Sequence, residues 1–152
     1  MSDHSLGLQK TIYDALDGDS TLQSLVSDVY DFVPENATFP YVKLGEETSV
    51  DNGTKTLQGN EHTLVIHTFS RYRGSKETKE IMSRIYALLH ESSLTVTGAS
   101  LVNLRFEFSD VIKENDGLTT HGLQRFRAVI YDRKKIYRRK IKWRQEKEVA
   151  FY

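Results

Sequence analysis

The sequence contains no cysteine, and this absence excludes several chemistries together. Disulfide bonds, thiolate zinc sites and cysteine nucleophiles all require the thiol. Apolar residues never run for the ~18 positions that a membrane-spanning helix needs. The opening segment, MSDHSLGLQK, also lacks the basic and apolar parts of a secretion signal. We therefore expect a protein that is made and kept in a reducing compartment inside a cell.

Catalytic motifs are missing as well. The sequence has no G-x-S-x-G nucleophile elbow, no phosphate-binding loop and no G-x-G-x-x-G dinucleotide motif. Glu77-Thr78-Lys79 has the letters of a nuclease E-x-K motif, but it lies in the first turn of a predicted helix, which is the wrong scaffold for that chemistry. We predict a protein that is not an enzyme and holds no cofactor.

The histidines and clustered acids form no metal-binding motif. His62 and His67 are five residues apart on one predicted strand, so their side chains point to opposite faces and cannot share a metal ion. We expect both to be unrelated histidines at the surface or half-buried, and we expect His121 to lie in a loop before the last strand. Four acids crowd a predicted strand end and turn without the spacing of a calcium loop, and we expect them to be solvated. They are Glu107, Asp110, Glu114 and Asp116.

Charge is balanced in total but divided unevenly along the chain. The 152 residues suit one compact domain. Residues 1–132 hold 12 Lys and Arg against 19 Asp and Glu, a charge of −7, whereas residues 133–152 hold 9 against 2, a charge of +7. An acidic body with a basic end favours contact with an anionic surface or an acidic neighbour. We predict one domain over residues 1–132 and a basic C-terminal arm over residues 133–152.

Three helices are predicted from apolar residues that recur at helical spacing. The first ends at Asp17-Gly18-Asp19, and the second begins where Ser20 and Gln23 have the form of a capping box. Ser75 is the expected cap of the third and longest helix. The three apolar stripes are Leu8, Ile12, Ala15 and Leu16; then Leu22, Leu25 and Val26; then Ile81, Ile85, Leu88 and Leu89.

Four strands are predicted as two hairpins. Val42 and Leu44 begin the first strand, and Asn52-Gly53 supplies the residues preferred in a two-residue turn. Residues 62–70 return with both faces partly apolar, as in a central strand, and Gly59-Asn60 predicts a bulge or loop. The second hairpin turns at Asp116-Gly117. Its alternating core residues are Val102, Leu104, Phe106 and Phe108, followed by Phe126, Ala128 and Ile130.

This order of elements predicts an α+β fold. Two hairpins separated by one long helix make a mostly antiparallel sheet of about four strands, with the long helix and the short N-terminal helices on one face. Residues 133–152 have too few apolar positions for a core element, so they form the arm.

The arm interleaves cations with aromatic and aliphatic residues. Such a segment can neutralise phosphates and stack on bases, and it can equally be a solvated or partner-bound extension. A small nucleic-acid-binding protein is therefore one alternative for the function. The arm residues concerned are Tyr137, Arg138, Arg139, Lys140, Ile141, Lys142, Trp143 and Arg144.

Several segments in order resemble the tail-completion and tail-terminator proteins of long-tailed bacteriophages and gene transfer agents. The similarity covers roughly residues 5–132, and the arm is longer and more basic than is usual in that family. The segments are Tyr13-Asp14-Ala15-Leu16, Gly18-Asp19, Leu22, Val29-Tyr30 with a following proline, FPYVKLGEET at 39–48, TLVIHTFSR at 63–71, Ala87 beside Leu88, and HGLQRFRAVI at 121–130.

The resemblance implies a virion structural protein that is made in the host cytoplasm. Similar proteins form a six-membered ring at the head-proximal end of the tail tube, stop tube polymerisation and join the tail to the head or neck connector. Expected partners are copies of the chain, the major tail tube protein and the connector, with DNA passing through the ring. A neck or head-completion role is an alternative. For contacts with neighbours we select Tyr41, Glu46 and Glu47 together with the arm residues Tyr137, Arg138, Arg139, Lys140, Lys142, Trp143 and Arg144.

Overall fold

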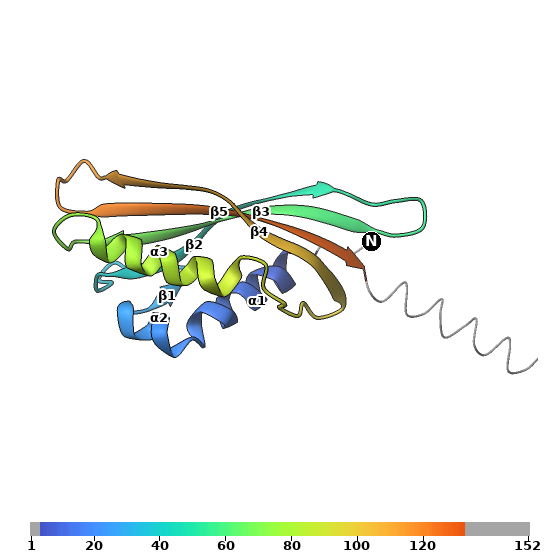
Figure 1. The fold of residues 1–152 in the computed structure, drawn as a ribbon, viewed down its shortest axis with the longest axis horizontal. Helices are drawn as coiled ribbons and strands as arrows, with labels where there is room; N and C mark the ends of the chain where they lie inside the picture. Colours follow the sequence, from blue (N-terminus) through green and yellow to red (C-terminus); the bar gives the residue numbers. More distant parts are fainter. Residues whose placement is uncertain (1–3, 133–152) are drawn as a thin grey trace, which may run out of the picture.

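The computed structural model describes residues 4–132, which form three helices and five strands (Figure 1). The predicted arm, with its selected residues from Tyr137 to Arg144, lies outside the described residues. In chain order the elements are α1 (Ser5–Asp17), α2 (Ser20–Leu25), β1 (Val29–Tyr30), β2 (Tyr41–Asp51), β3 (Gly59–Ser70), α3 (Lys76–Leu89), β4 (Ala99–Lys113) and β5 (Thr120–Asp132).

The strands form one sheet in the order β1-β2-β3-β5-β4. β2, β3, β5 and β4 pair antiparallel, whereas β1 pairs parallel with β2. The α+β prediction is confirmed, with β1 as one strand more than expected. Since β1 has two residues, it is too short to show the alternation from which strands are predicted.

All three helices cover one face of the sheet (Figure 1). Alternate residues of each strand point to this face and meet the apolar stripes of α1 and α3. Leu8, Ile12, Ile81 and Ile85 are buried there against Phe126 and its neighbours. The opposite face carries no helix from the described part of the chain, and we call it the open face. No helix in residues 4–132 is long and apolar enough to cross a membrane.

α2 begins one residue earlier than its capping-box pattern predicts. Asp19, not Ser20, is the N-cap, and its Oδ2 accepts a hydrogen bond from the Leu22 N–H at 2.8 Å. Arg84 on α3 donates to both oxygens of the same carboxylate, at 2.7 and 2.8 Å. Asp19 caps the helix instead of Ser20 because Arg84, distant in the sequence, holds the Asp19 carboxylate in place. Ser75 is the N-cap of α3, but its side chain makes no capping bond.

The β2–β3 hairpin forms with a longer connection than predicted. Residues 52–58 join the strands, and Gly53 does not adopt the positive φ expected of a two-residue turn. The chain reverses further out, where the Thr54 N–H donates to the Leu57 carbonyl at 2.7 Å. Gly59-Asn60 is a paired part of β3 and does not interrupt it. The bulge lies in β2, where Leu44 pairs with Ile66 but Glu47 pairs with Leu64.

β4 is bulged at two places, and this corrects the predicted inward set. Its register with β5 shifts between Leu101 and Asn103 and again between Phe106 and Phe108. Each extra residue changes which side chains face the core. Val102 and Phe108, expected inside, are therefore 61% and 43% exposed, whereas Leu104 is buried.

Candidate functional site

The two adjacent glutamates of the FPYVKLGEET segment serve opposite faces of the sheet. Glu47 points to the helix face, where its Oε1 lies 3.1 Å from Nδ1 of the fully buried His62. Glu46 points to the open face and contacts His67. The predictions that these two histidines occupy different faces and are unrelated to each other are confirmed, but the prediction that they lie at the surface or half-buried is wrong. Both are buried, and each has its own carboxylate.

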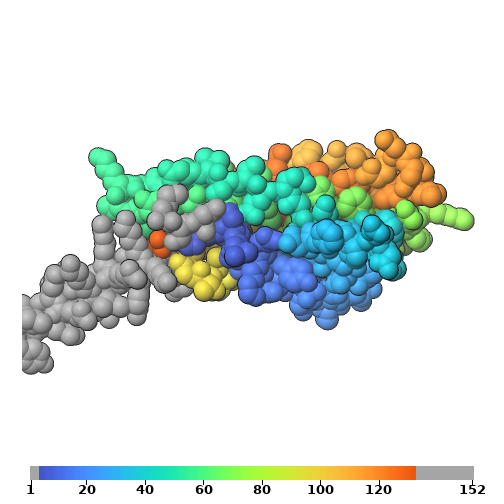
Figure 2. All heavy atoms as spheres, turned by 180° about the vertical axis from the view of Figure 1, so that it is seen from behind, coloured from blue at the N-terminus to red at the C-terminus, as the bar shows by residue number. Residues whose placement is uncertain are grey.

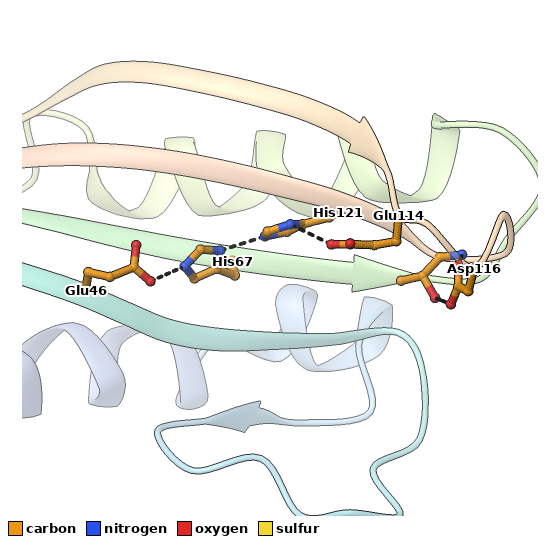
Figure 3. A network of polar contacts seen from close by, with 6 residues as sticks. Glu46, His67, Glu114, Asp116 and His121 are labelled. Carbon is orange, nitrogen blue, oxygen red and sulfur yellow. Dashed lines mark hydrogen bonds and ion pairs between the residues drawn. The ribbon is translucent and has the colours of Figure 1, made fainter.

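A row of four polar side chains crosses the open face (Figure 3). Glu46 Oε1 lies 2.9 Å from His67 Nε2, and His67 Nδ1 lies 2.6 Å from His121 Nε2. The other ring nitrogen of His121, Nδ1, lies 2.9 Å from Glu114 Oε1. The row therefore links β2, β3 and β5 to the residue that follows β4. We call these four residues, Glu46, His67, His121 and Glu114, the histidine row.

Strand register and packing position the two rings. His121 is part of β5, not of a preceding loop as predicted, and it pairs with Phe69 on β3. The rings of Phe69 and His121 stack with centroids 4.4 Å apart and planes 13° apart, and this stacking directs the His121 imidazole toward His67. Gly45, in the bulge of β2, leaves the space for His67, because a Cβ at that position would overlap the imidazole ring.

Two groups of the row, Glu46 and His121, have a pKa below the ordinary value. The hydrogen bond from His67 lowers the pKa of Glu46 from its ordinary value. Burial first, and the neighbouring charge of His67 second, lower the pKa of His121, while Glu114 acts in the opposite direction. Burial and the nearby His67 thus both disfavour the charged form of His121.

The β4–β5 turn holds a further ionised carboxylate beside the row. Asp116 Oδ1 accepts from the Leu118 and Thr119 N–H groups at 2.8 and 2.9 Å, and Oδ2 accepts from the Thr119 hydroxyl at 2.7 Å. These bonds lower the pKa of Asp116 to about 2. The predicted turn at Asp116-Gly117 is confirmed, and Gly117 takes the positive φ of 71° that it requires.

The four acids expected to be solvated are mostly bound to partners. Glu107 lies 3.1 Å from Arg125 and 3.9 Å from Arg127 on the open face. Glu114 belongs to the histidine row, and Asp116 caps the turn. Asp110 is exposed, as expected. No group of three or more His, Asp or Glu side chains within residues 4–132 is arranged to hold a metal ion.

An aromatic cluster continues the open face beyond the row. Tyr41 points away from the buried Val42, as predicted, and its ring centroid lies 5.2 Å from Phe69, 5.0 Å from Phe39 and 5.7 Å from Tyr30. The guanidinium of Arg71 lies 4.2 Å from the Phe39 centroid. Partial burial raises the pKa of the Tyr41 hydroxyl. These ring contacts surround the start of β2, which follows the Phe39–Pro40 pair.

The selected contact residues thus do not form one patch. Tyr41 and Glu46 share the open face, whereas Glu47 lies behind it. Sequence reasoning missed the pairing of His67 with His121, because these residues are far apart in sequence and meet only through the β3–β5 register. The available signal in the sequence was the pair Glu46-Glu47, on the predicted strand that precedes the strand of His62 and His67.

Comparison with known proteins shows similarity over nearly the whole described body. The model of the family described as tail completion protein gp17 matches residues 10–131. The tail completion protein gp17 of Bacillus phage SPP1 is 28% identical over 126 residues, which covers 83% of this chain and 93% of that protein.

Solved structures show the same fold. A chain in the virion of a native gene transfer agent particle superposes with a TM-score of 0.80 at 27% identity, covering 86% of this chain and 99% of that one. The structure of SPP1 gp17 matches with a TM-score of 0.59 at 23% identity, covering 82% and 88%, and shows likeness of fold alone.

Proposed function

The chain belongs to the tail completion protein gp17 family, and from this premise we propose that it forms a ring at the head-proximal end of a tail tube, terminates tube polymerisation and joins the tail to the head or neck connector. The observation that carries the proposal is the match, at a TM-score of 0.80 and over 99% of its length, to a chain of a gene transfer agent virion. A protein with this role is structural and catalyses no reaction.

Two different strand edges suit the chain for ring assembly. One edge of β2 pairs with β3, and on its other edge β1 covers only Val42 and Lys43, so the rest of that second edge has no strand neighbour among the described residues. Figure 2 shows β2, in turquoise, along the outside of the molecule above α1. On the other side the 15-residue β4 pairs only with β5 within residues 4–132. A cyclic ring needs two unlike surfaces on each subunit, and unpaired strand edges are ready templates for association.

The proposed partners are other copies of the chain, six in the ring, together with the major tail tube protein and the connector. Tyr41 and Glu46 on the open face, and Glu47 at the β2 bulge, are the proposed contact residues of the body. Glu46 remains 71% exposed although it contacts His67, so it has room for a second, basic partner. DNA passes through the lumen of the proposed ring.

The arm extends this proposal to neighbouring subunits. Residues 133–152 carry +7 and follow directly on β5, whereas residues 1–132 carry −7. We propose that the arm of one subunit binds the acidic body of the next subunit or the connector, with Tyr137 and Trp143 as anchors and the arginines and lysines from Arg138 to Arg144 setting the register.

Electron microscopy and native mass spectrometry of the purified full chain test the ring. We expect rings, or short stacks of rings, that hold six copies of the 17.5 kDa chain in each ring. A protein that stays monomeric at every concentration, and whose gene can be removed without loss of infectious or transfer-competent particles, would contradict the proposal. Particles that keep their tails but lack only the head junction would instead indicate a neck or head-completion role.

The basic arm also favours one other function, nucleic-acid binding. Affinity for DNA, measured across a range of salt concentrations, separates the two. If several arm cations neutralise phosphates, binding must weaken steeply as salt rises. Ring formation without measurable DNA affinity would remove this alternative.

A further inference from the structure

We propose that the histidine row holds one shared proton between His67 and His121, and that this proton fastens the open face across β2, β3, β5 and the end of β4. The inference concerns the single folded chain and does not depend on ring assembly.

The proton count follows from the contacts of the four ring nitrogens. The outer nitrogens, His67 Nε2 and His121 Nδ1, each lie 2.9 Å from a glutamate oxygen. Since a carboxylate only accepts hydrogen bonds, both outer nitrogens carry hydrogen. A neutral imidazole carries one hydrogen, so two neutral rings would leave both inner nitrogens bare.

Bare inner nitrogens do not fit the observed distance. His67 Nδ1 and His121 Nε2 are 2.6 Å apart, which is a hydrogen-bond distance and a repulsive one for two lone pairs. One hydrogen between them satisfies both atoms. The pair then holds three protons on four nitrogens and a charge of +1, and the two carboxylates make the net charge of the row −1. The lowered pKa of Glu46 agrees with a proton that resides on the rings and not on that carboxyl group.

Other charged groups on the open face are few near the row. On β2, Lys43 pairs with His67 in register and Tyr41 pairs with Phe69. On β5 and β4, Arg125 shares the face with His121, and Asp110 pairs with Leu123. At the strand ends, Arg71 and Asp116 are 4.0 Å apart. The described helices lie on the other face (Figure 1) and contribute none. The glutamates of the row are thus the anionic groups that touch its rings.

The shared proton makes the row intact only within a range of pH. A fourth proton places N–H groups on both inner nitrogens and separates the rings, whereas loss of the third leaves two opposed lone pairs. In the unfolded chain the two histidines, each with a pKa of about 6.5, together bind two protons beyond their neutral forms in acid and none in base. The folded pair binds one such proton. The contribution of the row to stability therefore rises with pH below about 6.5 and falls with pH above it.

Nitrogen-15 NMR of the histidine side chains in the full chain, at pH 7.5, counts the protons directly. We expect three protonated nitrogens across His67 and His121, with one proton shared between the inner atoms. Replacing Glu114→Gln removes one carboxylate but keeps both rings, and it should shift the loss of the shared proton downward by about one pH unit. Two protons in the wild-type pair, or rings that titrate independently, would overturn the proposal.

Unfolding experiments from pH 5 to 9 supply a second readout. In the wild-type chain the contribution of the row should pass through a maximum near pH 6.5, and His121→Gln should remove the decline on the alkaline side. The matched control is His90→Gln, because His90 lies outside the row and accepts from the Phe106 N–H. A control that changes the profile as much as His121→Gln would count against the row.

Discussion

Single side chains decide how the turns and helix starts of this protein are closed. Asp116 and Asp19 both bind backbone N–H groups with a carboxylate, and both carboxylates have a lowered pKa. For Asp116 the backbone bonds to Thr119 and Leu118 are the main cause, whereas for Asp19 the hydrogen bond from Arg84 is the main cause. The two residues therefore answer differently to substitution and to acid.

Asp116 should contribute to stability in a pH-dependent way. Its pKa is about 2 in the folded protein and about 3.9 in an unfolded chain, so the unfolded state binds more protons between these values. Its contribution is present above pH 4 and is lost as pH falls through about 2. The difference in free energy of unfolding between wild type and Asp116→Asn, measured by urea titration at several pH values, should shrink over this range. Asp110→Asn is the control, and an equal trend there would contradict the assignment.

Asp19 should matter where Ser20 does not. Asp19→Ala removes the α2 cap and the partner of Arg84, and we expect a loss of about 1–2 kcal/mol in free energy of unfolding. Asp19→Asn keeps a capping oxygen but not the charge, so its loss should be smaller. Ser20→Ala is the control, since the Ser20 side chain is not the cap. A larger loss for Ser20→Ala would restore the capping box predicted from the sequence.

At the scale of elements, close packing of α3 on β5 depends on a glycine. A Cβ at Gly122 would overlap Met82 and lie 2.8 Å from Thr78 Cγ2. We expect Gly122→Ala to lower the free energy of unfolding by about 1–3 kcal/mol, because the helix must move away from the strand. Denaturant unfolding measures the loss.

A second substitution separates this clash from a general effect of alanine in a strand. Met82→Ala removes the side chain that a Cβ at position 122 would meet. The double variant should therefore lose less stability than the two single losses added together. Additive losses would mean that the Met82 side chain is not what the added methyl group meets.

The elements were predictable where one local pattern governed them. The stripe of α3 and the alternation of β5 led directly to Ile81, Ile85, Phe126 and Ala128, all of which are buried. The bulges of β4 were not predictable, because an extra residue in one strand is decided by its register with the partner strand. The inward placement of Val102 and Phe108 failed for that reason.

At the scale of the whole molecule, charge separation predicts how subunits join. If the +7 arm of one subunit binds a −7 body, deletion of residues 133–152 should leave a folded monomer that assembles poorly. Circular dichroism checks the fold, and native mass spectrometry checks the oligomer. Rings that form normally without the arm would contradict this role.

Salt offers an independent check on the same contact. Attraction between exposed charges is screened within about 8 Å at physiological ionic strength. Assembly of the full chain should therefore weaken as salt rises, and assembly of the truncated chain, where detectable, should respond less. Light scattering across salt concentrations measures both. An equal response of the two chains would place the electrostatic contact elsewhere.

By itself, the sequence determined the α+β class, the helix and strand order apart from β1, the face of Tyr41 and the tail-completion family. The class, the order and the face follow from periodicity and turn residues, and the family follows from the resemblance of several segments in order; all of these are local or linear properties of the chain. Only the tertiary structure decided that Glu46 and Glu47 bind different histidines, and that His67 meets His121. Such contacts depend on strand register and on one bulge in β2, and register is fixed by packing of the complete sheet, which no single segment encodes.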